Sequence, residues 1–273
     1  MIYDTKRILL TLRFDGSGFY GWQAQNGGNT VQQTVQDAIE TVFRERLGVS
    51  GCGRTDSGVH ALGYCCHIDI KKDFPTERLA NALNLYFFSQ NIKIAVVDAC
   101  EVSDDFHSRY YIKSKEYIYK IQNNKYRDPF YTGKALHYHR PIDIDKMREA
   151  AEYLKGEHNF ACFMADRSDI PVEQAVRNLY RLEIEIADEK CRIINIIMAA
   201  SGFLYKMARI ISGTLLEVSE GKINPVDLSG IINSRNRRNA GRTLPPHGLY
   251  LNKIEYYSDD EIAELIKSGD IYK

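Results

Sequence analysis

The chain has 273 residues, of which 44% are hydrophobic and 26% are charged, and this composition excludes a disordered or fibrous protein. Lys and Arg together number 36, as do Asp and Glu, so the formal net charge is zero and lacks the basic excess of many nucleic-acid-binding proteins. No stretch approaches the ~20 apolar residues of a membrane span, and the N-terminus lacks the apolar run of a signal peptide. We therefore expect a cytoplasmic protein without membrane contact. Its six cysteines form no C-x-x-C pair, so we expect reduced thiols.

The first part of the chain alternates predicted strands and helices. Apolar residues at every second position over residues 8–14 predict a strand. Helical spacing predicts a helix over residues 30–47, with Thr30 and Gln33 as a capping box at its start. The next predicted elements are a strand over 61–70, a helix over 75–87, a strand buried on both faces over 92–102 and a strand over 110–122.

The second part of the chain repeats this alternation in outline. A helix is predicted over residues 143–156, with an apolar stripe of Met147, Ala150, Ala151 and Leu154. The remaining predicted elements are a hairpin over 176–200 turning at 187–190, a helix over 203–221, a shorter helix over 224–234, a strand over 248–257 and a helix over 259–269.

This order of elements predicts two α/β halves of similar size. We place the first half at residues 1–109 and the second at residues 110–257. A helical tail follows at residues 258–273, and we expect it to pack on the second half.

The stretch SGCGRTDSGVHALG at residues 50–63 combines three polar side chains with four glycines. Glycine lets the backbone adopt positive φ and approach a ligand closely, so this stretch is a candidate active-site loop. In extended chain Arg54 and Asp56 project to the same face, and the guanidinium would keep the carboxylate ionised, as a nucleophile or a base requires. The structural alternative is an Asx turn, in which Asp56 accepts from backbone amides and Arg54 points to water. We expect His60 to brace the loop as a hydrogen-bond donor.

Within this loop, GRTDSGVHALG closely resembles the G-R-T-D-x-G-V-H motif of the tRNA pseudouridine synthase A (TruA) family. The resemblance implies that Asp56 is the essential catalytic residue and that Arg54 is its companion. Other stretches resemble further family motifs in the same order, namely FDGSGFYGWQ, DDFHSRY, KEYIYKI, FLYKMARIISGTLLEVSEG and PPHGLYL. The sequence departs from the usual family residues at Ala24, Phe87, Phe88 and Ile210.

The resemblance implies the α+β pseudouridine synthase fold. In this fold, two α/β halves related by approximate pseudo-symmetry form a continuous mixed, mostly antiparallel sheet, with helices on its outer face and a central active-site cleft. The first half would carry the catalytic loop, and the second half would complete the RNA cleft.

The implied activity is the isomerisation of uridine to pseudouridine in the anticodon stem-loop of tRNA, at tRNA positions 38, 39 and 40. In the matching motifs, Tyr117 would stack on the target base, Leu249 would lie by the pocket, and Arg209 would pair with Asp56. On sequence alone, Tyr117 also fits a half-buried strand residue, Arg209 a snorkelling arginine, and Leu249 a core residue. Whether Asp56 attacks the sugar carbon, adds to the ring or removes a ribose proton stays open. Neither a metal nor a cofactor is expected.

The implied partners are tRNA and a second copy of the chain in a homodimer. The basic residues that we expect to contact RNA phosphates are Lys113, Lys115, Arg235, Arg237 and Arg238. One alternative is a non-enzymatic RNA-binding module, which the presence of both Asp56 and Tyr117 disfavours. Another is a carboxylate-dependent hydrolase, which would need a second carboxylate in a comparable setting.

Overall fold

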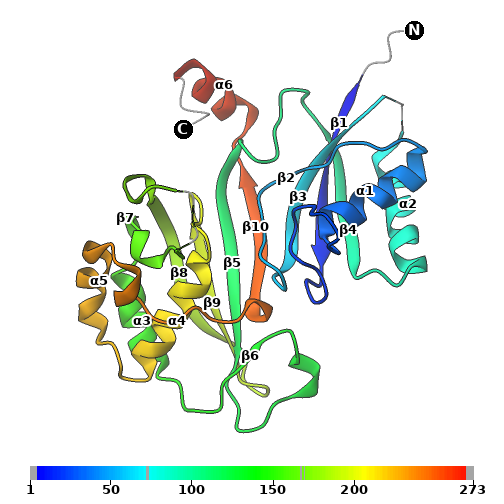
Figure 1. Cartoon of the computed structure of the whole chain (residues 1–273). Coiled ribbons are helices and arrows are strands. Elements are labelled where there is room, and N and C mark those ends of the chain that lie inside the picture. Colours follow the sequence, from blue (N-terminus) through cyan, green and yellow to red (C-terminus); the bar gives the residue numbers. More distant parts are fainter. Residues whose placement is uncertain (1–4, 72–73, 167, 169, 269–273) are drawn as a thin grey trace. The chain divides into compact units, whose positions relative to one another are not determined.

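The structure is a computed structural model that describes residues 5–71, 74–166, 168 and 170–268 (Figure 1). The described chain forms two compact units. Unit 1 contains described residues from 5 to 113 and from 251 to 268, and unit 2 contains described residues from 114 to 250. The expected functional division, with a catalytic first half and a second half that completes an RNA cleft, stays a prediction.

Unit 1 is an antiparallel sheet with three described α-helices, two from the first part of the chain and one at its C-terminal end. Its strands lie in the order β4, β1, β3, β10, and the short strand β2 pairs with β3. Helix α2 packs on β4, and α1 packs beside α2 (Figure 1). The element bounds are β1 Lys6–Phe14, α1 Val31–Phe43, β2 Ser50–Gly51, β3 His60–Ile70, α2 Thr76–Ser89, β4 Ile94–Val102 and β10 Leu249–Tyr256.

The sequence pattern explains most of unit 1. Alternate residues of β1, among them Ile8, Leu10 and Leu12, are fully buried, as a strand with one apolar face requires. The predicted helix start is confirmed, because the Thr30 side chain accepts a hydrogen bond from the Gln33 amide. The helix ends earlier than predicted because Arg44 adopts a left-handed conformation with φ of 57°.

The expectation that strand β4 is buried on both faces is wrong. Most of its residues from Val97 onward are exposed or half-buried, and Val97 itself is 46% exposed. The reason is position, because among the described strands β4 pairs only with β1 and so lies at the edge of the unit 1 sheet. Apolar residues in an edge strand satisfy the same sequence pattern without being covered on both sides.

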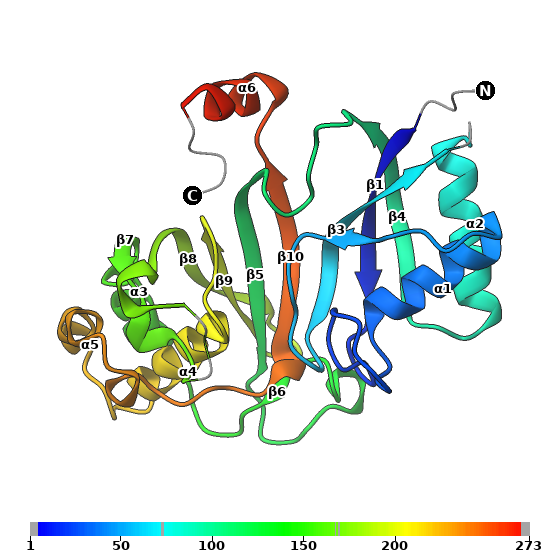
Figure 2. The same ribbon diagram turned by 45° about the horizontal axis from the view of Figure 1, so that its top comes forward.

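Unit 2 is a second, mostly antiparallel sheet. Strands β5, β9, β8 and β7 lie in that order with antiparallel pairing, and β6 pairs in parallel with β5. Helix α3 packs on α4 and on β8 (Figure 2). The element bounds are β5 Ile112–Gln122, β6 Leu136–His137, α3 Ile144–Glu152, β7 Gly156–Asn159, β8 Val176–Asp188, β9 Ile193–Ala200, α4 Met207–Ser219 and α5 Leu228–Ser234. The single-turn 3-10 helices are η1 Pro129–Tyr131, η2 Ala161–Phe163, η3 Val172–Gln174, η4 Pro225–Asp227, η5 Arg237–Asn239 and η6 Pro246–Gly248.

The two units confirm the predicted α+β class, a mixed and mostly antiparallel multi-strand sheet with helices. The pseudo-symmetry of the halves and the central cleft stay predictions. Helix α4 begins later than predicted because Lys206 has φ of 60°, a left-handed conformation that interrupts helical geometry. None of the six cysteines, all of which the structure describes, forms a disulfide. No helix in the described residues is long and apolar enough to cross a membrane.

The C-terminal helix α6, Asp259–Ser268, belongs to unit 1. Its Ile262 is buried in one cluster with Phe106 and Tyr111, and Glu261 accepts a hydrogen bond from the Lys113 ammonium at 2.7 Å. The tail therefore contacts residues on both sides of the predicted boundary at residue 110, Phe106 on one side and Tyr111 and Lys113 on the other, and its expected packing on the second half stays a prediction. Its short apolar face shows only that the helix needs a partner surface, and the partner lies far away in the sequence.

A buried histidine on β3 predicts acid sensitivity of the fold. Burial, with the nearby Arg7 and His107, lowers the pKa of His67 to about 4, and its Nδ1 accepts the Ser108 amide hydrogen at 3.2 Å. Between pH ~6.5 and ~4 this histidine is therefore protonated in the unfolded chain but not in the folded chain. The free energy of unfolding falls as the pH is lowered through this range, by no more than about 3 kcal/mol. Urea unfolding at pH 7 and pH ~4.5 measures this loss. An identical loss in His67→Gln would contradict the assignment to His67.

Candidate active site

The segment at residues 50–63, which we call the Gly-rich loop, contains β2, the start of β3 and the tight turn between them. The Asp56 carbonyl accepts the Val59 amide hydrogen at 3.2 Å, and Gly58 has φ of 79° at the third position of this turn. A type II turn requires positive φ at that position, which explains the glycine. Asp56 therefore occupies the first position of a defined turn, and it is half-buried.

A second glycine-rich stretch, residues 15–22, packs against the backbone of the Gly-rich loop. A Cβ atom on Gly16 would lie 2.0 Å from the Val59 carbonyl oxygen, and one on Gly21 would lie 2.3 Å from the Thr55 carbonyl oxygen. Across the same contact, the Trp22 amide donates to the Thr55 carbonyl at 3.3 Å. Only glycine permits this approach, so two separate glycine-rich stretches together fix the backbone on both sides of Asp56.

His60 braces the Gly-rich loop, although its Nδ1 does so as an acceptor. The imidazole is almost fully buried, and its Nδ1 accepts the Gly16 amide hydrogen at 3.0 Å. The prediction of bracing is confirmed. The same Nδ1 also lies 3.2 Å from the Asp15 carboxylate, which can only accept, and the donor role stays a prediction. A second brace comes from Tyr64, whose hydroxyl donates to the Gly53 carbonyl at 2.6 Å and whose ring stacks on Trp22 at 4.0 Å.

Arg54 does not pair with Asp56 in this structure. Its side chain is exposed and makes no hydrogen bond or ion pair with any described residue of the chain. The expected common face fails because the chain is not extended here: β2 ends at Gly51 and Asp56 already begins a turn. A role for Arg54 in the active site stays a prediction, and its free guanidinium is available to a ligand.

The neighbour of Asp56 gives a prediction about stability. The Thr55 hydroxyl is buried and has no hydrogen-bond partner among the described residues. A buried hydroxyl without a partner is unfavourable, so Thr55→Val, which keeps the shape, is expected to raise the free energy of unfolding by about 1 kcal/mol. Thr55→Ser keeps the hydroxyl and loses a methyl group, so it is expected to lower it. Urea unfolding of both variants measures the difference, and a Val variant less stable than the Ser variant would contradict this account.

In unit 2, strand β5 carries Tyr117. The residue is half-buried, lies opposite Met198 of β9, and packs edge-on against Phe203 with ring centroids 4.8 Å apart. Tyr119 is two residues further and so projects from the same face of the strand. It is fully buried, and its hydroxyl donates to the Pro245 carbonyl at 2.8 Å.

Arg209 of helix α4 lies at the same region of unit 2. Its Nε donates to the Leu244 carbonyl at 2.7 Å, and its charge opposes the rise in the pKa of Tyr119 that burial produces. The segment 244–249 is therefore held on one side by α4 and on the other by β5. Leu249 ends this segment and is buried. The structure thus brings together Arg209, the start of β10 and the Tyr117 strand, while the Arg209–Asp56 pair stays a prediction.

Sequence reasoning missed three residues around this region, namely Phe203, Tyr119 and His247. His247 is half-buried, and burial followed by the charges of Arg127 and Arg209 lowers its pKa, so it is neutral at neutral pH. All three stand inside quoted motifs, Phe203 in FLYKMARIISGTLLEVSEG, Tyr119 in KEYIYKI and His247 in PPHGLYL, and Tyr119 follows Tyr117 at the strand period. Those positions were the available signal.

The basic residues expected to contact RNA fall into different settings. Lys113 is paired with Glu261 at 2.7 Å, and Lys115 is half-buried on β5. Arg235 is the exposed C-cap residue of α5. Arg237 donates hydrogen bonds within its own loop, and Arg238 is exposed. Contact of these residues with RNA stays a prediction.

Within the part of the chain that the structure describes, no group of three or more His, Cys, Asp or Glu side chains is placed to hold a metal ion. The run Cys65, Cys66, His67 contains residue types that can ligate a metal, but its side chains have structural roles. All three side chains are buried in β3, and the His67 Nδ1 accepts a hydrogen bond from Ser108.

Comparison with known proteins gives consistent matches. The family profile described as tRNA pseudouridine synthase matches residues 11–111 and 150–257. A tRNA pseudouridine synthase A of Caldicellulosiruptor bescii is 39% identical over 251 residues, which cover 92% of this chain and 100% of the relative. Proteins of the same name from a Thermoanaerobacter species and from Bacillus pumilus are 40% and 39% identical, over 92% of this chain and 100% and 99% of their own lengths.

The chain belongs to the tRNA pseudouridine synthase family. The matched ranges of this tRNA pseudouridine synthase family member contain the Gly-rich loop with Asp56, and they contain Arg209 and Leu249. Tyr117 lies between the two ranges. The assignment of Tyr117 as a substrate residue therefore depends on the KEYIYKI resemblance and on its place on β5.

Proposed function

We propose that this protein is a TruA-type tRNA pseudouridine synthase that isomerises uridine to pseudouridine in the anticodon stem-loop, at tRNA positions 38, 39 and 40, with Asp56 as the catalytic carboxylate. The observation that carries the proposal is the construction around Asp56. Two glycine-rich backbones in contact, at Gly16–Val59 and Gly21–Thr55, hold a half-buried carboxylate at the start of a turn. Such a rigid loop suits a group that must meet a substrate in one geometry.

The proposed reaction breaks the bond between C1' of the ribose and N1 of uracil, turns the base, and forms a bond between C1' and C5. The C5 proton is then lost and N1 gains a proton, so the product is an isomer of the substrate. The Asp56 carboxylate attacks the sugar carbon, adds to the ring or removes a ribose proton. All three routes need the ionised form of the carboxylate.

The other site residues have roles set by their chemistry. The target nucleotide must leave its stack, and an exposed base gains about 1–3 kcal/mol by stacking on an aromatic ring. Tyr117 provides such a ring, fixed edge-on by Phe203, and Leu249 provides an apolar wall. Arg209 is oriented through its bond to Leu244, and we propose that its positive charge and the Arg54 guanidinium stabilise negative charge on Asp56 or the substrate.

We further propose that the protein acts on tRNA as a homodimer in the cytoplasm. The names of its bacterial relatives, which are tRNA pseudouridine synthases, support tRNA as the substrate. A substrate made and used in the cytoplasm supports that location. The homodimer is supported by the family resemblance alone, and sedimentation of the purified protein measures it.

Tritium release from tRNA labelled at C5 of uridine tests the proposed reaction. Isomerisation replaces the C5–H bond by a C5–C1' bond, so each pseudouridine formed releases one tritium to water. A non-enzymatic RNA-binding module would bind the tRNA without release. A hydrolase would instead liberate free uracil that keeps its label.

A further inference from the structure

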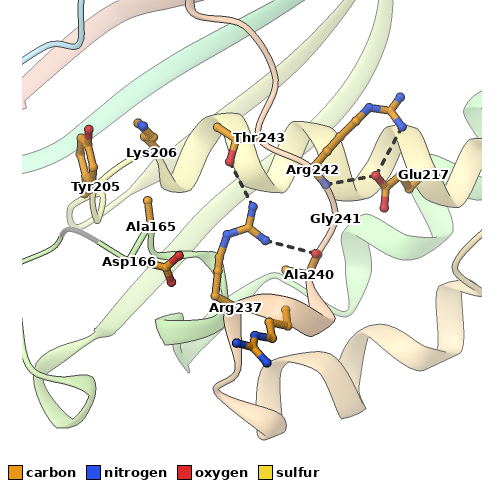
Figure 3. Close-up of a pocket in the computed structure, with 11 residues that line it drawn as sticks. Ala165, Asp166, Tyr205, Lys206, Glu217, Arg237, Ala240, Gly241, Arg242 and Thr243 are labelled. Carbon is orange, nitrogen blue, oxygen red and sulfur yellow. Dashed lines mark hydrogen bonds and ion pairs between the residues drawn. The ribbon is translucent and has the colours of Figure 1, made fainter.

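Unit 2 contains a pocket apart from the residues of the candidate active site. Of the predicted site residues discussed above, only the RNA candidates Arg237 and Arg238 line it. We call it the basic pocket; its volume is about 580 Å³, within the range of ligand-binding pockets (Figure 3). Three segments far apart in the sequence form it. The lining residues are Ala165, Asp166, Tyr205, Lys206, Glu217, Arg237, Arg238, Ala240, Gly241, Arg242 and Thr243.

Among its four cationic residues, Arg242 is neutralised within the fold. Its Nη1 lies 3.3 Å from Glu217 and its Nη2 lies 2.5 Å from Glu220 (Figure 3 shows the Glu217 contact). The bond to Arg242, with those to Lys222 and Tyr138, lowers the pKa of Glu220 to about 2. Arg242 therefore shapes the pocket and has little charge to offer a ligand.

Arg237 keeps its full positive charge in a fixed position. Its guanidinium donates to the Ala240 carbonyl at 3.2 Å and to the Thr243 hydroxyl at 3.1 Å, and it lies between these two groups in Figure 3. Both acceptors are neutral, and no described carboxylate pairs with it. A cation held only by neutral acceptors keeps its positive field, because no ion pair with a described carboxylate cancels it.

Arg238 and Lys206 are the cations free to contact a ligand. The Arg238 side chain is exposed and makes no hydrogen bond or ion pair with the described residues. The Lys206 ammonium lies 4.8 Å from the centre of the Tyr205 ring, and no described acid pairs with it. Lys206 is also the N-cap of α4, which has no side-chain cap and no acidic residue in its first turn. The positive end of this helix therefore adds to the charge of the pocket.

The pocket also contains the Asp166 carboxylate, which forms no ion pair with the described residues. The three cations Lys206, Arg237 and Arg238 outnumber it, so the pocket is positively charged. We propose that the basic pocket binds a backbone phosphodiester of the RNA substrate, with Arg238 and Lys206 as the groups that contact the phosphate. Arg238 offers a fork of donors that matches two phosphate oxygens, and Lys206 offers a point charge. The volume exceeds that of a phosphate and accommodates the adjoining ribose. The inference rests on the proposed function. It assigns phosphate contact to Arg238 and not to Arg237, because the Arg237 guanidinium already donates hydrogen bonds within its own loop.

The test removes both contacting charges and compares the result with a matched control. The variant is Lys206→Asn with Arg238→Gln, because asparagine tolerates the left-handed conformation of residue 206. The control is Lys190→Gln with Arg140→Gln, two exposed cations of unit 2 outside the pocket and without ion pairs to described residues. Binding of an unmodified tRNA transcript is measured between about 50 and 200 mM salt.

We expect the pocket variant to raise the Kd for tRNA about tenfold at low salt and to reduce the slope of log affinity against log salt by about one, as loss of one phosphate contact predicts. Equal Kd and slope in the pocket and control variants would overturn the inference. The inference would also be overturned if calorimetry showed that the pocket variant loses binding of inorganic phosphate while its tRNA affinity equals that of the control. That result would assign the pocket to free phosphate.

These outcomes are separate from those of the proposed function. A wild-type protein that releases no tritium contradicts the proposed reaction, whereas the tRNA affinities of the two variants still decide whether the pocket binds RNA. A wild-type protein that releases tritium, with a pocket variant indistinguishable from the control, contradicts the pocket alone.

Discussion

Asp56→Asn is expected to lower kcat for pseudouridine formation by at least about 10³-fold while the Kd for tRNA changes by less than about threefold. The amide has the size of the carboxylate, and Asn is equally suited to the first position of the turn that begins at residue 56. It cannot, however, act as an anionic nucleophile or as a base. The change therefore removes the chemistry and leaves the loop.

The matched control for this variant is Asp98→Asn, on the exposed edge strand β4 of the same unit. It removes one negative charge from unit 1 without touching the Gly-rich loop. Tritium release under single-turnover conditions separates the chemical step from binding. Turnover of Asp56→Asn within about tenfold of the control would contradict the catalytic assignment.

Gly21→Ala is expected to lower the free energy of unfolding by about 3 kcal/mol or more and to lower pseudouridine formation with it. Two effects add. Gly21 has φ of 90°, which alanine adopts only with strain, and the new Cβ would lie 2.3 Å from the Thr55 carbonyl oxygen. Relief of that overlap must move the backbone next to Asp56.

Gly18→Ala separates these two effects. Gly18 has φ of 88°, nearly that of Gly21, but a Cβ there meets nothing within 4 Å. It is therefore expected to show the strain alone, about 1–2 kcal/mol, and to keep its activity. Urea unfolding and tritium release on both variants make the comparison. Equal stability losses would show that the Gly21–Thr55 approach does not hold the loop.

The sequence was most informative where short-range physics decides the structure. The alternation of Ile8, Leu10 and Leu12 predicts β1, and the pair Thr30 and Gln33 predicts the start of α1. Both signals lie within a few residues of the feature that they predict, so no knowledge of the tertiary fold is needed.

The features that the sequence did not predict depend on long-range neighbours. The pattern of β4 does not reveal that the strand lies at an edge, and the pattern of α6 does not reveal that Ile262 packs with Phe106 and Tyr111. The late start of α4 follows from the left-handed Lys206, a conformation that lysine adopts rarely and that propensity does not predict.

The candidate site divides in the same way. The motif identifies Asp56, and its glycines mark a loop that needs unusual backbone. It does not show that Gly16 and Gly21 hold that loop, nor that Arg54 is exposed and apart from Asp56. The basic pocket is still further from sequence reasoning, because it exists only where three separate segments meet.

The most direct measurement is the mapping of pseudouridine in an unmodified tRNA transcript after incubation with the purified wild-type protein. Our account predicts new pseudouridine at one or more of tRNA positions 38, 39 and 40, and none after incubation with Asp56→Asn. A transcript that binds the protein yet keeps every uridine unchanged would contradict it.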